Sequence, residues 1–444
     1  MIPILILGLV IVVKHMCGAR YELFEPLSFI ILNVFIGVTG RSIYIDLTSS
    51  YTHSKLLNGY SKNILYNGQF LIIVGLIALS LGYILGHSTK ILNLKYIDNL
   101  EWDKKRTSLI SWLISIVAFI GIILFIHAMG ISIDSFVDIS KKRALFEDGH
   151  RVTLSYNGWL ASLGSLAFAL ALILFLSMRK RLLSKWGFLL FLTGIVTLAF
   201  PVLTSVRGQL VNFMLTIFII WYYLGSRKSK QKRLPKMKVA LSIIMVVIII
   251  LVMTGMRASK NSEDVTDFVS LSSIAENIFG SGNFFGVAKT SVALEEIPKN
   301  VNYLYGESLI QWIVSPIPRS LWPEKPLSLD FRFGSEVYGQ DFSNNSGGGR
   351  PPGFMVELYW NFGVVGVIVG MFFLGLFLAV LYRSFHPLLL MKNKTAVLLY
   401  SIFVLPLAML LIGNDLSRTI VTILKSLVPT LLILWLIREK NKRV

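Results

Sequence analysis

Long apolar runs separated by short polar segments dominate this chain of 444 residues. Most runs have about 18 to 22 residues, enough for a helix to cross the ~30 Å hydrocarbon core of a bilayer. The pattern predicts an all-α polytopic membrane protein with about eleven transmembrane helices. We expect them near residues 2–14, 27–45, 65–87, 107–129, 157–178, 187–205, 208–226, 237–256, 358–382, 395–413 and 419–437.

Composition agrees with this class, because 54% of residues are hydrophobic and only 15% are charged. The net charge of +19 comes largely from short basic segments such as 179–185 and 227–238. Dense basic loops mark the cytoplasmic side of a membrane protein, so we place the C-terminus in the cytosol and interpret the charge as a topology signal. We expect no nucleic-acid partner. The single cysteine, Cys17, excludes a disulfide framework and a cysteine-ligated zinc site.

Loop lengths divide the chain into three parts. Residues 1–256 would hold eight transmembrane helices, 257–357 a large extracytoplasmic loop, and 358–444 the last three helices with a basic cytosolic tail. The loop is far longer than a connection requires, which favours a functional role. Its first half predicts short helices on the membrane face, the first capped by Ser262. Its second half, rich in Pro and Gly, predicts irregular backbone that lines a wet cavity.

Cationic side chains gather on the predicted outer face and are candidates for binding a phosphate or carboxylate. Charge close to a bilayer is costly and is by default functional, although each residue could instead extend to the lipid headgroups. Planar guanidinium groups suit a diphosphate. Arg41 and Lys425 fall within predicted spans. The candidates are Arg143, Arg207, Arg319, Lys325, Arg332, Arg350 and Arg418.

Glu357 is the candidate general base. It lies among aromatic residues at the predicted outer end of the 358–382 helix and could accept a proton from a sugar hydroxyl. The alternative is a carboxylate that only pairs with an arginine. Tyr338 and Trp360 could stack on sugar rings, or could be ordinary core or interfacial aromatics. The sequence has no histidine cluster or other metal signature, so we expect neither a metal nor a cofactor.

Three segments together resemble the O-antigen repeat-unit polymerases of the Wzy family. They are NYLYGESL (302–309), SPIPRSLWPEKP (315–326) and GFMVELYWNFGVVGVIVG (353–370). The segment TSVRGQL (204–210) and the predicted topology are similar to that family in kind.

The resemblance implies a GT-C-like fold in the bacterial inner or plasma membrane, with the active site on the extracytoplasmic face. It implies transfer of a growing O-antigen or capsule-type glycan from undecaprenyl diphosphate to a new lipid-linked repeat unit. The transfer would invert the anomeric carbon and need no metal. Arg319 and Glu357 would be catalytic, and the other cations would hold the diphosphate. Partners would be the lipid-linked oligosaccharides, membrane lipids and a chain-length regulator protein.

Three alternatives stay open at this point, and one of them, a noncatalytic membrane scaffold, would not need so many charges beside the bilayer. A lipid-linked glycan ligase would have a similar layout, but such ligases use a histidine near the end of the long loop, and residues 257–352 contain none. A transporter or flippase for the same lipid would also need a cationic cavity. It would spread the charges through the helices, and the sequence shows no internal repeat of the kind common in transporters.

Overall fold

The computed structural model describes residues 24–48, 63–89, 91–128, 158–178, 184–203, 207–225, 286–317, 321–340, 349–408 and 413–439, with scattered single positions and two short strands. The elements before the long loop are α2 (Pro26–Val34), the π-helical η1 (Phe35–Gly40), α3 (Arg41–Thr48), α4 (Ile64–Ser88), α5 (Lys95–Asp98), α6 (Lys104–Ala128), β1 (Phe146–Glu147), β2 (His150–Arg151), α8 (Gly158–Met178), α9 (Lys185–Leu203) and α10 (Arg207–Gly225). Those that follow are α13 (Val287–Glu296), α14 (Glu307–Val314), α15 (Leu329–Arg332), the π-helical η4 (Phe333–Val337), α16 (Phe354–Leu390), α17 (Lys394–Leu399), the π-helical η5 (Tyr400–Val404), α18 (Leu405–Ala408) and α19 (Leu416–Ile437).

Five helical stretches in the described part of the chain are long and apolar enough to cross a membrane. They are Pro26–Leu47, Ile64–Ser88, Lys104–His127, Phe354–Leu390 and Leu416–Ile437. Shorter apolar helices occupy the predicted spans at 157–178, 187–205, 208–226 and 395–413. The prediction of an all-α, multi-pass membrane protein is confirmed. The runs 237–256 and, apart from scattered positions, 2–14 lie outside the described residues, so a total of eleven spans and the GT-C-like fold stay predictions.

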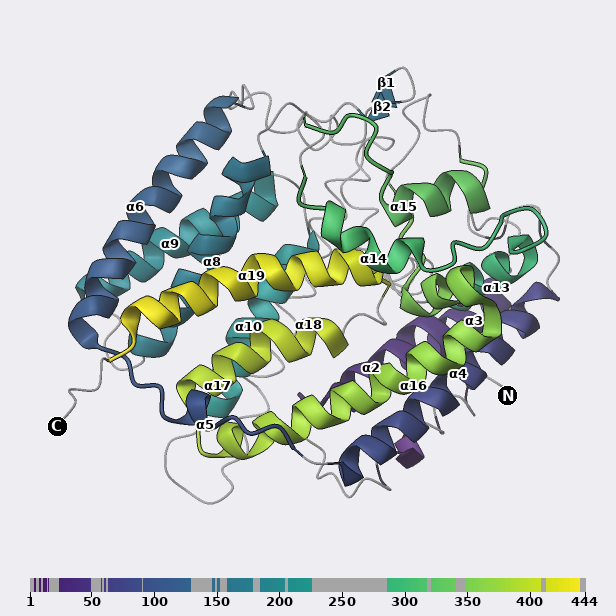
Figure 1. Ribbon diagram of the computed structural model, residues 1–444, viewed down its shortest axis with the longest axis horizontal. Helices are drawn as coiled ribbons and strands as arrows, with labels where there is room; N and C mark the ends of the chain where they lie inside the picture. Colours follow the sequence, from purple (N-terminus) through teal and green to yellow (C-terminus); the bar gives the residue numbers. More distant parts are fainter. Residues whose placement is uncertain are drawn as a thin grey trace.

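Two groups of helices flank α19 (Figure 1). On one side, α16 and α4 run side by side, with α2, α3 and α13 close to them. On the other side, α6, α8 and α9 pack together. The N-terminal end of α19 meets α14, which belongs to the long loop. This end of α19 is therefore where the loop, α16 and the membrane helices come together.

Glycines allow α4 and α16 to pack backbone against backbone. A methyl group on Gly82 would overlap the carbonyl oxygen of Phe372, and one on Gly375 would overlap that of Leu79. Gly86, four residues after Gly82, faces α16 in the same way. Small residues four apart are a common device for close helix contact in membranes, where apolar burial gives no net attraction between helices. The contact fixes α16 on α4.

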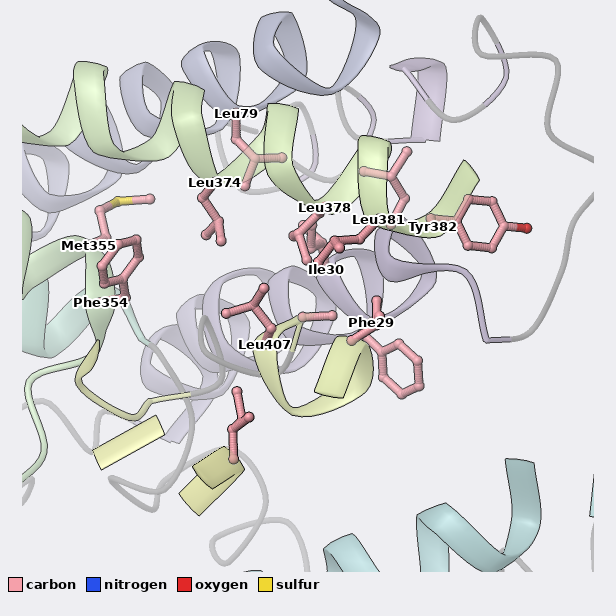
Figure 2. Close-up of a cluster of buried hydrophobic side chains, with 14 of the residues drawn as sticks. Phe29, Ile30, Leu79, Phe354, Met355, Leu374, Leu378, Leu381, Tyr382 and Leu407 are labelled. Carbon is pink, nitrogen blue, oxygen red and sulfur yellow. The ribbon is translucent and has the colours of Figure 1, made fainter. Parts of the chain in front are cut away.

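Apolar side chains fill the space between this helix pair and its neighbours. Figure 2 shows Leu374 and Leu378 of α16 near Leu79 of α4, with Ile30 of α2 and Leu407 of α18 in the same cluster. All five side chains are less than 9% exposed. The cluster packs α2, α4, α16 and α18 together. This packing fixes the positions of the helices that carry the polar residues near the long loop.

Helix α16 is interrupted near its start. Phe362 and Gly363 have non-helical backbone angles, and Gly363 has φ +62°, a conformation that suits glycine. The hydroxyl of Tyr303 lies near the site of a Cβ on Gly363, at 3.2 Å. The break separates a short first segment, Phe354–Asn361, from the long apolar remainder. The short segment carries Glu357, which the sequence pattern placed at the end of the loop.

The long loop differs in part from its predicted form. Seven of the ten residues of α13 are buried, so this helix packs against the rest of the protein, and the expectation that the short helices lie on the membrane face stays a prediction. Helix α13 contacts α4 at Gly68, where a methyl group would overlap Ser291. The second half of the loop is not irregular throughout, because α14, α15 and η4 form there. The predicted cap Ser262 lies outside the described residues.

Candidate functional site

Glu357 joins three segments that are far apart in the sequence. Its Oε1 accepts a hydrogen bond from the Ser308 hydroxyl at 2.9 Å, and its Oε2 accepts one from the Leu416 N–H at 2.6 Å. Ser308 lies in α14, and Leu416 is the first residue of α19. The side chain is fully buried. Both carboxylate oxygens are therefore engaged in holding the first turns of α14 and α19 against α16.

Asn361, one turn after Glu357, completes this junction. Its side-chain amide donates to the Ser308 hydroxyl and to the Glu357 carbonyl, each at 2.7 Å, and its Oδ1 accepts from the Gly306 N–H at 2.8 Å. The Ser417 hydroxyl of α19 also donates to the Ser308 carbonyl, at 2.9 Å. We name Glu357, Ser308 and Asn361 the carboxylate junction. Buried polar groups that are fully hydrogen-bonded in this way fix a unique geometry.

A cluster of positive charge lies beside the junction. Lys289 of α13 is 1% exposed, and its Nζ donates to the Pro351 carbonyl at 2.6 Å. Its electrostatic neighbours are Arg41, Arg350 and Arg418, with Asp330 as the neighbouring carboxylate. Burial, followed by these three guanidinium groups, lowers the pKa of Lys289 to about 7. We name Arg41, Lys289, Arg350 and Arg418 the cation cluster.

Asp330 connects two members of the cation cluster. Its carboxylate forms an ion pair with Arg418, and its backbone carbonyl accepts from the Arg350 N–H at 2.7 Å. Asp415 caps α19 by accepting the Arg418 N–H at 2.7 Å, and burial raises the pKa of this aspartate although Arg418 opposes the shift. Glu357 acts on the same helix end through Leu416. The carboxylate junction therefore positions the turn that carries Arg418.

Tyr338 forms one wall of the cation cluster. The Arg350 guanidinium lies 4.5 Å from the centre of its ring, within cation–π range. Its hydroxyl makes no hydrogen bond to another described residue, and burial raises the pKa of this phenol. The side chain of Arg418 is 40% exposed and Arg350 is half-buried, whereas Arg41 and Lys289 are buried. Arg418 and Arg350 are therefore the more accessible members of the cation cluster.

The structure places the other candidate residues as follows. Lys325 donates to the carbonyls of Ser315 and Ile317 at 2.6 and 2.9 Å, so it holds the end of α14. Arg332 pairs with Glu307 and Glu336 and lies 5.8 Å from the ring of Trp360, whose indole N–H donates to Asn302. Arg207 is the first residue of α10. Arg143 and Arg319 lie outside the described residues.

Several residues of the site were not among the sequence candidates. They are Arg41, Lys289, Asp330, Asp415, Ser308 and Asn361. A signal existed for Arg41, because a charge inside an apolar run is unusual. Lys289 gave a weaker signal, a lysine within the otherwise small and apolar start of α13. In the described part of the chain, no three histidine, cysteine, aspartate or glutamate residues lie together so as to hold a metal ion.

Comparison with known proteins decides the family. The family model for O-antigen polysaccharide polymerase Wzy matches residues 2–443, essentially the whole chain. The chain belongs to this family. Wzy membership confirms the resemblance seen in the sequence and implies an O-antigen repeat-unit polymerase that acts on lipid-linked oligosaccharides in a membrane. No curated protein and no solved structure matches this Wzy chain significantly.

Proposed function

We propose that this Wzy-family protein transfers a growing glycan from undecaprenyl diphosphate to the terminal sugar of a new lipid-linked repeat unit. The reaction would take place on the extracytoplasmic face of the inner or plasma membrane, with inversion and without a metal. The observation that carries this proposal is the cation cluster, in which four positive side chains from four separate segments lie around Asp330 and Tyr338. A lipid diphosphate is the anion that the family's substrate class supplies.

The cation cluster fits the charge that develops during transfer. The acceptor hydroxyl oxygen would form a bond to the anomeric carbon while the bond from that carbon to the diphosphate oxygen breaks. The diphosphate leaves with an additional negative charge, and fixed cations stabilise that charge in a site of low dielectric constant. Arg350 and Arg418 would contact the phosphates directly. Arg41 and Lys289 would act from behind them, and the Tyr338 hydroxyl would donate to a phosphate oxygen.

Glu357 has a different role in this proposal from the one that the sequence indicates. Both of its oxygens already accept hydrogen bonds, and the side chain is fully buried. A base must reach the proton that it removes, at about 2.6–3.2 Å. The geometry supports Glu357 as a positioning residue, because its bond to Leu416 holds the turn of Arg418. The role of general base stays a prediction.

Purified protein with a lipid-linked repeat unit tests the function, with glycan length measured on a gel. We expect wild type to form a ladder and Arg418→Ala to lose it at unchanged protein level. Arg418→Lys would recover little, because an ammonium group cannot replace a planar guanidinium fork. Lys299→Ala is the matched control, since Lys299 pairs with Glu295 on the surface and such pairs contribute little. A normal ladder from Arg418→Ala would remove the cation cluster from the mechanism.

A further inference from the structure

Lys289 is the member of the cation cluster whose charge can change near neutral pH. It is buried, and within the part of the chain that the structure describes its Nζ donates to the Pro351 carbonyl. Guanidinium groups keep their protons at all relevant pH values, whereas a buried amine gives its proton up readily. An amine surrounded mainly by positive charge is the group that a bound anion would affect most.

The surroundings of the amine come from every element packed against it. Among the described residues, the charged groups that act on the amine are Arg41 of α3, Asp330 of α15, Arg350, and Arg418 of α19. One step further out, Tyr338 neighbours Arg350, Arg41 and Tyr60, Asp415 neighbours Arg418 and Asp330, and Glu357 of α16 neighbours Asp415. Of these, the three guanidinium groups disfavour a proton on Lys289, and Asp330, which is paired with Arg418, favours one. Among the described groups that act on the amine, positive charge therefore outweighs negative charge.

We infer that Lys289 is a substrate-coupled proton site: a diphosphate diester entering the cation cluster draws one proton from solvent onto the Nζ of Lys289. This rests on the proposed function, since it takes the lipid diphosphate as the ligand. The balance is simple. Two negative charges arrive, the neutral amine gains a proton to become an ammonium, and no covalent bond to Lys289 forms or breaks.

Two physical effects drive this uptake. A doubly charged anion within a few ångströms offsets the repulsion from the three guanidinium groups, and it does so in a buried setting where charges interact strongly. The pKa of about 7 in the ligand-free protein leaves the amine about half neutral at pH 7 and mostly neutral at pH 8, so it can take up most of a proton at pH 8. The resulting ammonium then adds to the charge that stabilises the departing diphosphate.

Titration calorimetry measures this directly. The probe is a short-chain prenyl diphosphate esterified at its other end to a sugar, in which neither phosphate titrates near neutral pH. Binding to the full-length protein in detergent is measured in buffers of different ionisation enthalpy, which gives the protons taken up per ligand. At pH 8 we expect nearly one proton per diphosphate bound. Affinity should fall about fivefold from pH 7 to 8 and then about tenfold per pH unit.

Variants assign the proton to Lys289. Lys289→Arg keeps its charge and Lys289→Met cannot carry one, so in both we expect no proton uptake and a flat dependence of affinity on pH. Lys299→Ala should behave as wild type. The wild-type measurement decides the matter even where a variant fails to fold, as judged by its melting temperature.

The outcomes separate the two proposals. Wild-type binding with no proton uptake, or uptake that persists in Lys289→Arg, would overturn the assignment of Lys289 and leave the diphosphate site in place. No binding by wild type between pH 6 and 9 would overturn the diphosphate site itself, and the inference with it.

Discussion

Replacing Glu357 with glutamine and with alanine distinguishes a positioning role from a role as general base. The carboxylate accepts one hydrogen bond from Ser308 and one from Leu416. Glutamine has nearly the same shape and keeps one oxygen for the Leu416 N–H. Its amide group would then face the Ser308 hydroxyl, which already accepts from Asn361 but has a second lone pair. Alanine keeps neither bond.

The structure sets the expected magnitudes. A buried donor that loses its acceptor costs about 1–3 kcal/mol, so alanine, which leaves the Leu416 N–H and the Ser308 hydroxyl without theirs, should lose about 2–6 kcal/mol from the junction. Glutamine should lose about 1–2 kcal/mol, since it keeps the bond from Leu416 and changes only the contact with Ser308. If the lost free energy weakens the positioning of Arg418 by the first turn of α19, the polymerisation rate of Glu357→Gln should fall about tenfold. About 1.4 kcal/mol corresponds to a factor of ten in rate. Glu357→Ala should lose more than 100-fold and melt earlier.

The assay combines two measurements on each purified variant: the initial rate of glycan extension and the melting temperature in detergent. A general base predicts a different pattern, with both variants reduced to the same low rate by about 10²–10⁴-fold. Glu295→Gln is the control, an acidic residue in the surface pair with Lys299. A Glu357→Gln protein that melts like wild type but makes no polymer would refute the positioning role and restore the base.

Two further variants test the frame of the site. Gly82→Ala should lower the melting temperature and the amount of protein in the membrane, because the added methyl group would meet the Phe372 carbonyl and force α4 away from α16. A wild-type melting temperature would show that the two helices can move apart without loss of stability. Lys325→Ala should cost about 1 kcal/mol of local stability, through the lost bonds to Ser315 and Ile317, and leave affinity for the diphosphate probe unchanged. Weakened probe binding in calorimetry would instead place Lys325 among the phosphate ligands.

The hydrophobic pattern predicts the membrane helices well because bilayer thickness sets their length. The run 65–87 appears as α4, Ile64–Ser88, and 419–437 as α19, Leu416–Ile437. The start of α16 was harder to foresee. Phe354 begins a helix directly after a Pro- and Gly-rich stretch, and the break at Gly363 depends on a backbone angle that no periodicity reveals. Glu357 was therefore predicted at a loop end, when it lies within a helical turn.

The sequence named some of the residues that the structure brings together, whereas their role in binding a substrate stays a prediction. Arg350 and Arg418 both contact Asp330, and Tyr338 lies against Arg350. Arg332 and Lys325 satisfy local partners instead, and local pairing cannot be told from ligand binding by sequence. Lys289 was missed because its significance comes from groups on four other segments. Long-range proximity of this kind leaves no mark on one sequence.

The adjacency of Arg350 and Pro351 has a consequence for how the loop and the buried amine behave. Arg350 presents its guanidinium beside Tyr338, while the next carbonyl, that of Pro351, holds the Lys289 amine. Two neighbouring residues thus serve a partly exposed contact and a buried one. A ligand that moved this stretch of backbone would therefore change the position of the Arg350 guanidinium and the hydrogen bond of the Lys289 amine together.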